Sequence, residues 1–150
     1  MVVIEVPSEY GWVILGAGIG NFVTGQYMAG AIMSARKKFD VKYPNLYATP
    51  GYHKKADDFN RYQRGHQNYI ENIGPYVTLA MLGGLKYPIA NAIGSVLYLV
   101  GSVLYLKGYV DTSLDVTTAR YKKGGGVKWI GFFISLYSTG ALAYSLIKSS

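Results

Sequence analysis

The sequence predicts an all-α membrane protein, built as a four-helix transmembrane bundle with both termini on the non-cytosolic side. Two observations indicate this fold class: long stretches without charge, and connectors that collect most of the basic residues. Half of the 150 residues are hydrophobic and only 15% are charged, against about 25% charged residues in an average soluble domain. A chain of this length forms a single domain, which we expect to cover residues 1–150.

Four stretches are long enough to cross a bilayer as helices, which takes about 20 mostly apolar residues. The predicted spans cover about residues 10–35, 65–85, 87–106 and 129–147. The second span contains one acid, Glu71, whereas the other three contain no charged residue. Pro88 suits the first turn of the third helix, and the short connector before it makes the second and third spans antiparallel neighbours.

Glycines within the spans predict close helix packing. Gly16, Gly20, Gly94 and Gly101 leave room for the backbone of a neighbouring helix. The segment from Gly16 to Gly20 does not have the spacing of a dinucleotide-binding loop and follows no predicted strand, which argues against nucleotide binding.

The distribution of basic residues gives the orientation in the membrane. Residues 36–64 and 107–128 carry most of the 15 lysines and arginines. Four spans place these two connectors on one side, and the positive-inside rule makes that side cytosolic. The net charge of +7 is therefore explained by membrane topology, and we expect the lipid bilayer as a partner and no nucleic acid.

The chain contains no cysteine. This excludes a cysteine nucleophile, so any sulfur chemistry must use a thiol that a ligand brings. The two histidines, His53 and His66, form no recognised set of metal ligands, and we expect no metal.

Polar residues gather at the start of the second span. Arg64, Asn68 and Glu71 follow i, i+4 and i+7 spacing, which places them on one face of a helix. An acid within a span is costly unless it is paired or solvated. Either Glu71 forms a structural ion pair with a neighbouring cation, or the three residues form a pocket for a zwitterionic or anionic ligand. In such a pocket Arg64 suits a carboxylate and Glu71 an ammonium group.

Tyr105 and Tyr109 lie one turn apart near the end of the third span. They are interpreted either as part of an aromatic belt at the membrane surface or as a pair of hydroxyls that lines the same pocket. His66 points away from the stripe formed by Arg64, Asn68 and Glu71, so a role as a catalytic base has little support.

Several motifs give the sequence a family resemblance. They are Glu9-Tyr-Gly11, Ser34-Ala-Arg-Lys-Lys38 with Val41-Lys-Tyr-Pro44, the segment 59–71 with its core Gln63-Arg64-x-His66-Gln-Asn68-x-x-Glu71, and Val103-Leu-Tyr-x-x-Gly-Tyr109. The chain resembles the membrane-associated eicosanoid and glutathione metabolism (MAPEG) family, most closely the branch of microsomal glutathione S-transferase 3. The motifs occur in the family's order over roughly residues 9 to 110.

The resemblance implies a homotrimer that binds glutathione as a co-substrate between adjacent subunits, in the membrane of the endoplasmic reticulum or the mitochondrion. One subunit would contribute Arg36, and its neighbour would contribute Arg64, Asn68, Glu71, Tyr105 and Tyr109. His66 occupies a further motif position that touches the ligand. The thiolate of glutathione would attack a lipophilic electrophile or reduce a lipid hydroperoxide.

Two departures from the family keep a second hypothesis open. The basic residue that activates the thiolate normally follows the Gly-Tyr pair closely, whereas here an apparent insertion leaves Arg120 as the candidate activator. Ser102 stands where close relatives carry arginine. The alternative is a non-catalytic, structural MAPEG-like subunit of a larger membrane complex, such as a mitochondrial one.

Overall fold

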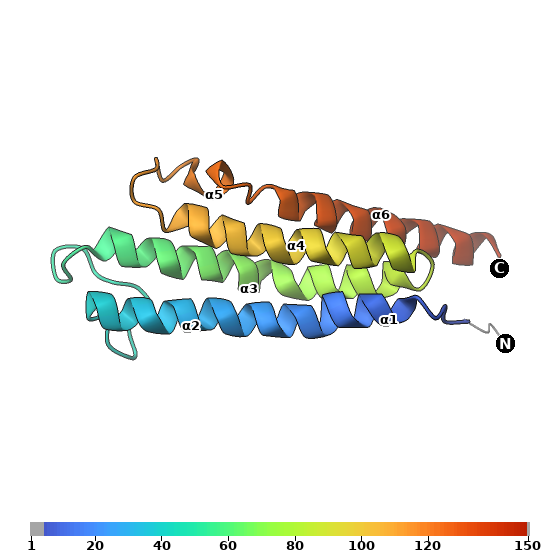
Figure 1. Cartoon of the computed structure of the whole chain (residues 1–150), viewed down its shortest axis with the longest axis horizontal. Helices are drawn as coiled ribbons and strands as arrows, with labels where there is room; N and C mark the ends of the chain where they lie inside the picture. Colours follow the sequence, from blue (N-terminus) through green and yellow to red (C-terminus); the bar gives the residue numbers. More distant parts are fainter. Residues whose placement is uncertain (1–4, 150) are drawn as a thin grey trace.

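The computed structural model describes residues 5–149, and all regular secondary structure in this range is helical (Figure 1). The helical elements are α1 (Tyr10–Val13), the π-helical stretch η1 (Ile14–Gly20), α2 (Asn21–Phe39), α3 (Ala56–Gly84), α4 (Pro88–Tyr109), α5 (Ala119–Lys122) and α6 (Val127–Lys148). The all-α prediction is confirmed for this range. Residues 1–4 and 150 of the predicted single domain lie outside the described residues.

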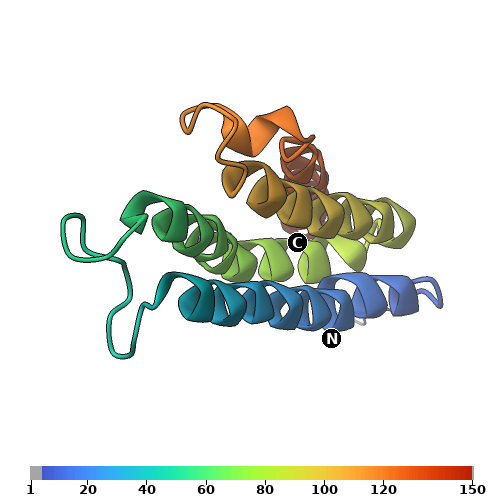
Figure 2. The same cartoon turned by 60° about the vertical axis from the view of Figure 1, so that its left-hand side comes forward.

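The first three elements continue into one another as a single rod, α3 and α4 lie against it, and α6 covers the side of α3 and α4 away from the rod (Figures 1 and 2). Helix α4 packs against both α3 and α6, and α3 also contacts α2. The start of α1 and the end of α6 lie at one end of the molecule, and the loops 40–55 and 110–118 lie at the other (Figure 1). The polar residues of the predicted pocket belong to this second end.

Two helices, α4 and α6, are long and apolar enough to cross a membrane. They correspond to the predicted spans 87–106 and 129–147, and Pro88 occupies the first turn of α4 as expected. Helix α3 begins at Ala56, well before the predicted span 65–85. The charged residues ahead of that span therefore continue the helix instead of forming a loop, since Asp, Arg and Asn are tolerated on an exposed helix face.

The four glycines predicted to allow close packing do lie against neighbouring elements. A Cβ at Gly16 would lie 2.7 Å from the Ser95 Cβ, and one at Gly101 would lie 2.3 Å from the backbone nitrogen of Lys128. Gly20 and Gly94 likewise face Leu99 and Gly131. The predicted close approach of a neighbouring backbone is confirmed at Gly94 and Gly101, whose nearest contacts are backbone atoms of α6. At Gly20 the atom nearest to an added Cβ would be at the flexible end of the Leu99 side chain.

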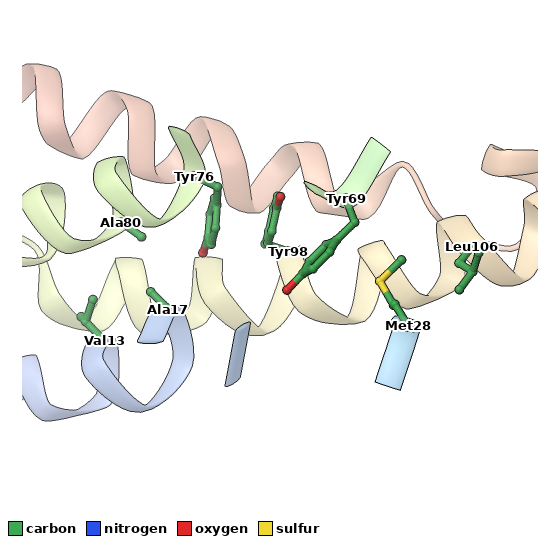
Figure 3. Packing of buried hydrophobic residues seen from close by; sticks show 8 residues of the cluster. All are labelled: Val13, Ala17, Met28, Tyr69, Tyr76, Ala80, Tyr98 and Leu106. Carbon is green, nitrogen blue, oxygen red and sulfur yellow. The ribbon is translucent and has the colours of Figure 1, made fainter. Parts of the chain in front are cut away.

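The buried core runs between the helices and carries tyrosines as well as aliphatic residues (Figure 3). Tyr76 and Tyr98 stack with ring centroids 3.6 Å apart. The Tyr76 hydroxyl donates to the Ser95 hydroxyl at 3.1 Å, and the Tyr69 hydroxyl donates to the Asn21 carbonyl at 2.7 Å. The polar groups of this central region are uncharged.

Candidate functional site

Helix α3 places Arg64, Asn68 and Glu71 on one face, as their spacing predicts. The Arg64 Nη1 lies 3.1 Å from the Glu71 Oε1, and the two side chains are 50% and 44% exposed. Pro75 has no N–H to donate to the Glu71 carbonyl one turn before it, so that carbonyl also lacks its helical partner. The Glu71 carboxylate is thus paired with Arg64 of its own helix, and both side chains of the pair remain accessible from outside the chain.

A cavity of about 460 Å³ lies beside Arg64. It is bounded by α3, by the end of α4 and by the loops 40–55 and 110–118. Its lining residues are Tyr47, Asp57, Asn60, Arg61, Arg64, Tyr109 and Val116. The space next to Arg64 thus combines cationic, amide, acidic and aromatic groups, which suits a ligand that carries charges of both signs.

Arg61 holds one wall of this cavity. Its Nη1 donates to the carbonyl of Asp111 at 2.8 Å and to that of Leu114 at 3.2 Å. The loop 110–118 is thereby fastened to α3 over the site. On the other side, the Asn60 amide exchanges two hydrogen bonds with the backbone of Ala48, at 2.9 and 3.0 Å.

The tyrosine pair lies at the inner edge of the site. The rings of Tyr105 and Tyr109 are stacked, with centroids 6.0 Å apart. Tyr105 is only 6% exposed, and Tyr109 lines the cavity. A belt residue would present its ring to the membrane surface, so the aromatic-belt interpretation does not describe Tyr105.

Arg120 lies near this tyrosine pair because two glycines allow its segment to approach α4 closely. A Cβ at Gly108 would lie 2.3 Å from the Ala119 carbonyl oxygen, and one at Gly125 would lie 2.2 Å from that of Arg120. The charge of Arg120 interacts with the side chains of Tyr105 and Tyr109. Its Nε is buried and makes no hydrogen bond within residues 5–149. Despite the apparent insertion before it, Arg120 thus lies against α4.

Lys128 is the site residue that the sequence did not reveal. The sequence places it among the basic residues of the connector 107–128, but the residue is 1% exposed. Its ammonium donates a hydrogen bond to the Asn68 Oδ1 and lies 4.3 Å from the centre of the Tyr105 ring. The available signal was its position between the triple glycine 124–126 and the uncharged stretch that begins at Trp129.

Arg36 does not line the cavity next to Arg64. It is 9% exposed, and its two terminal nitrogens donate to the carbonyls of Val41 and Asn45 at 3.2 and 2.8 Å. The guanidinium also lies 4.4 Å from the Tyr43 ring centre. Within one chain Arg36 therefore shapes the loop after α2, and its predicted contact with a ligand of the neighbouring subunit stays a prediction.

His66 is half-buried within α3, and no hydrogen bond joins its side chain to another group of the described range. The same range contains no cluster of three or more histidine or acidic side chains that could hold a metal ion.

The family model of MAPEG matches residues 14–147, a range that contains every residue of this site. The chain belongs to the MAPEG family. MAPEG proteins are integral to membranes and include glutathione-dependent transferases and peroxidases. In this MAPEG chain the matched region covers the loops over the cavity as well as the apolar helices α4 and α6.

Proposed function

We propose that the protein is a glutathione-dependent transferase or peroxidase that acts on lipophilic electrophiles or lipid hydroperoxides in the membrane. The observation that carries this proposal is the open pair of Arg64 and Glu71, of which Arg64 lines a cavity of about 460 Å³ and Glu71 lies outside its lining. Glutathione has two carboxylates and one ammonium group, so it offers a partner to each charge. The cavity has the size of a small-molecule site, which is roughly 300–1,000 Å³.

The pair of Arg64 and Glu71 can be exchanged for ligand contacts at little cost. Because both side chains are about half exposed, their mutual attraction contributes only about 0–1 kcal/mol. A bound zwitterion would give Arg64 a carboxylate and Glu71 an ammonium group. The ion pair that the sequence left as an alternative is therefore compatible with a binding site.

Arg120 and the tyrosine pair are suited to activate the thiol. A positive charge and hydroxyl donors favour the thiolate, which is the nucleophilic form. With an electrophile, the thiolate sulfur forms a bond to carbon while that carbon's bond to the leaving group breaks, and the leaving group departs with the electron pair and takes up a proton. With a hydroperoxide, it attacks oxygen and releases the alcohol, and a second glutathione converts the resulting sulfenic acid to the disulfide and water.

The proposed assembly is a homotrimer of four-span subunits of the microsomal glutathione S-transferase 3 type, with both termini on the non-cytosolic side. It would lie in the membrane of the endoplasmic reticulum or the mitochondrion. Arg36 would then face glutathione held by the neighbouring subunit, together with His66, Asn68 and the tyrosines. Two of the five N–H donors of Arg36 bond to loop carbonyls, so three donors remain for a ligand carboxylate.

Glutathione binding by the detergent-purified protein tests the proposal. We expect saturable binding by calorimetry and an ultraviolet difference signal from the thiolate. Arg64→Ala and Glu71→Ala should each weaken binding by about tenfold or more, because each removes one charged contact. Lys107→Ala changes an exposed cation at the end of α4 and serves as the control. Wild-type affinity in both site variants would contradict the site.

Ser102 favours the second candidate, a non-catalytic subunit of a larger membrane complex. The residue is 3% exposed, and its hydroxyl makes no hydrogen bond of full geometry within residues 5–149, with the Tyr98 hydroxyl as a weak partner. A neutral group is thus buried where close relatives of the resembled branch carry arginine. The mass of the detergent-extracted particle separates the two: a homotrimer that binds glutathione supports the enzyme, and a large hetero-complex supports the subunit.

A further inference from the structure

Lys128 is a buried cation whose position is fixed by the contact between α4 and α6. Its side chain is 1% exposed. A Cβ at Gly101 would lie 2.3 Å from the Lys128 backbone nitrogen and 2.7 Å from its Cα. Because only glycine allows this approach, the start of α6 is held against α4, and the lysine side chain is directed across α4 towards α3.

The surroundings of the ammonium only partly compensate its burial. An ammonium group has three donors, and one of them bonds to the Asn68 Oδ1. The rings of Tyr105 and Trp129 lie 4.3 and 4.6 Å from the nitrogen, at distances typical of cation–π contacts. No carboxylate within residues 5–149 forms an ion pair with Lys128. The Glu71 carboxylate acts on the ammonium through its charge alone, without an ion pair, so the chain compensates the charge only in part.

This contact determines which way the Asn68 amide faces. A lysine ammonium can only donate, so the amide oxygen must be the atom that faces Lys128. The amide nitrogen then faces the other way, and its two N–H groups make no hydrogen bond within the described residues. Asn68 lies one turn from both Arg64 and Glu71 on the same face of α3.

We propose that Lys128 is a positioning residue that makes Asn68 a hydrogen-bond donor to a carboxylate of glutathione. The proposal rests on the proposed function and assigns one feature of its specificity. Without the ammonium, the amide could present its oxygen to the ligand as readily as its nitrogen, and an oxygen repels a carboxylate. Lys128 also adds a buried positive charge behind the donor.

The test compares the affinity of the purified protein for glutathione and for two analogues that each lack one carboxylate. One analogue has the glycine carboxylate as an amide, and the other has 4-aminobutyrate in place of the γ-glutamyl group. We expect the wild type to prefer glutathione over one of them by about tenfold or more. In Lys128→Met, that preference should fall to about twofold or less. Lys122→Met removes an exposed cation of the same connector and should keep the full preference.

A purely structural role for Lys128 would lower all three affinities together and leave their ratio unchanged, which would overturn the inference. Asn68→Asp provides a second test if Lys128→Met does not fold, because it keeps an oxygen for the ammonium but has no N–H to donate. We expect it to lose the preference as well, and its retention would refute the assigned role. If the wild type itself binds no glutathione, the proposed function fails and this inference fails with it.

Discussion

Two cations at the polar face of α3, Lys128 of α6 and Arg64 of α3 itself, differ in burial and in the charge of their partner. Lys128 is almost fully buried and contacts a neutral amide, whereas Arg64 is half exposed and contacts a carboxylate. Burial fixes the position of Lys128, while exposure leaves Arg64 free to exchange its partner. The difference indicates a division of labour in which the packed side orients Asn68 and the open side meets the ligand.

Among changes on the packed side, Gly101→Ala should lower the free energy of unfolding most. The added Cβ would lie 2.3 Å from a backbone nitrogen of α6, and a backbone atom cannot move away as a flexible side chain can. Overpacking of this kind typically costs about 1–3 kcal/mol, and we expect a loss near the upper end, about 3 kcal/mol, in detergent unfolding experiments.

Gly140→Ala is the matched control for Gly101→Ala. Gly140 lies within α6, and a Cβ there meets no heavy atom within 4 Å. Alanine also favours the helix over glycine by about 1 kcal/mol. The control should therefore be neutral or stabilising, and equal losses in both variants would refute the packing argument.

Asn68→Leu should have the next largest effect, because it leaves the Lys128 ammonium without an oxygen acceptor among residues 5–149. A hydrogen bond to a charged group contributes about 1.5–3 kcal/mol, so we expect a loss of about 2 kcal/mol in unfolding free energy. The double variant Asn68→Leu with Lys128→Met should recover much of this loss, since no charge is then left unpaired. Additive losses in the double variant would contradict the coupling.

Substitutions of the buried tyrosines should change stability less, because these residues are buried as fully as Lys128 but carry no charge. Tyr76→Phe removes the hydrogen bond to Ser95 and should cost about 1 kcal/mol. The Tyr98 hydroxyl makes no hydrogen bond of full geometry within residues 5–149 and has only the Ser102 hydroxyl as a weak partner, so Tyr98→Phe should cost less than Tyr76→Phe. Thermal unfolding of the two variants side by side measures the difference, and a larger loss for Tyr98→Phe would contradict it.

The open side should respond weakly in stability even though it governs binding. Removing the partner of a half-exposed ion pair changes the unfolding free energy by about 0–1 kcal/mol. Arg64→Ala and Glu71→Ala should therefore unfold nearly as the wild type does while they lose glutathione affinity. A drop above about 2 kcal/mol would show that the pair is structural and would favour the first interpretation of Glu71.

The sequence predicted the helices and the open part of the site because both depend on local patterns. Uncharged stretches gave α4 and α6, and the i, i+4, i+7 spacing placed Arg64, Asn68 and Glu71 on one face. These features require only the period of a helix and the cost of charge in an apolar environment.

The packed part of the site could not be predicted because it depends on tertiary contacts. Lys128 looks like any other loop cation until Gly101 is known to face its backbone. Arg36 similarly looks free to bind a ligand until its guanidinium is found on the carbonyls of Val41 and Asn45. Composition and spacing do not reveal which cation a fold buries.

The smallest expected effect on stability concerns the loop 110–118, which lines the cavity and is held in part by an ion pair at the surface. Lys123, followed by Ser113, stabilises the Asp111 carboxylate and lowers its pKa from 3.8 to about 2. Because the folded-state pKa is depressed, this contribution is fully present above pH 3.8 and is lost as the pH falls through about 2. An NMR titration of the Asp111 carboxyl in the detergent-solubilised protein should give a midpoint near 2. Lys123→Met should move that midpoint upward with little change in unfolding temperature at neutral pH, whereas an unchanged midpoint would show that Lys123 does not hold the loop.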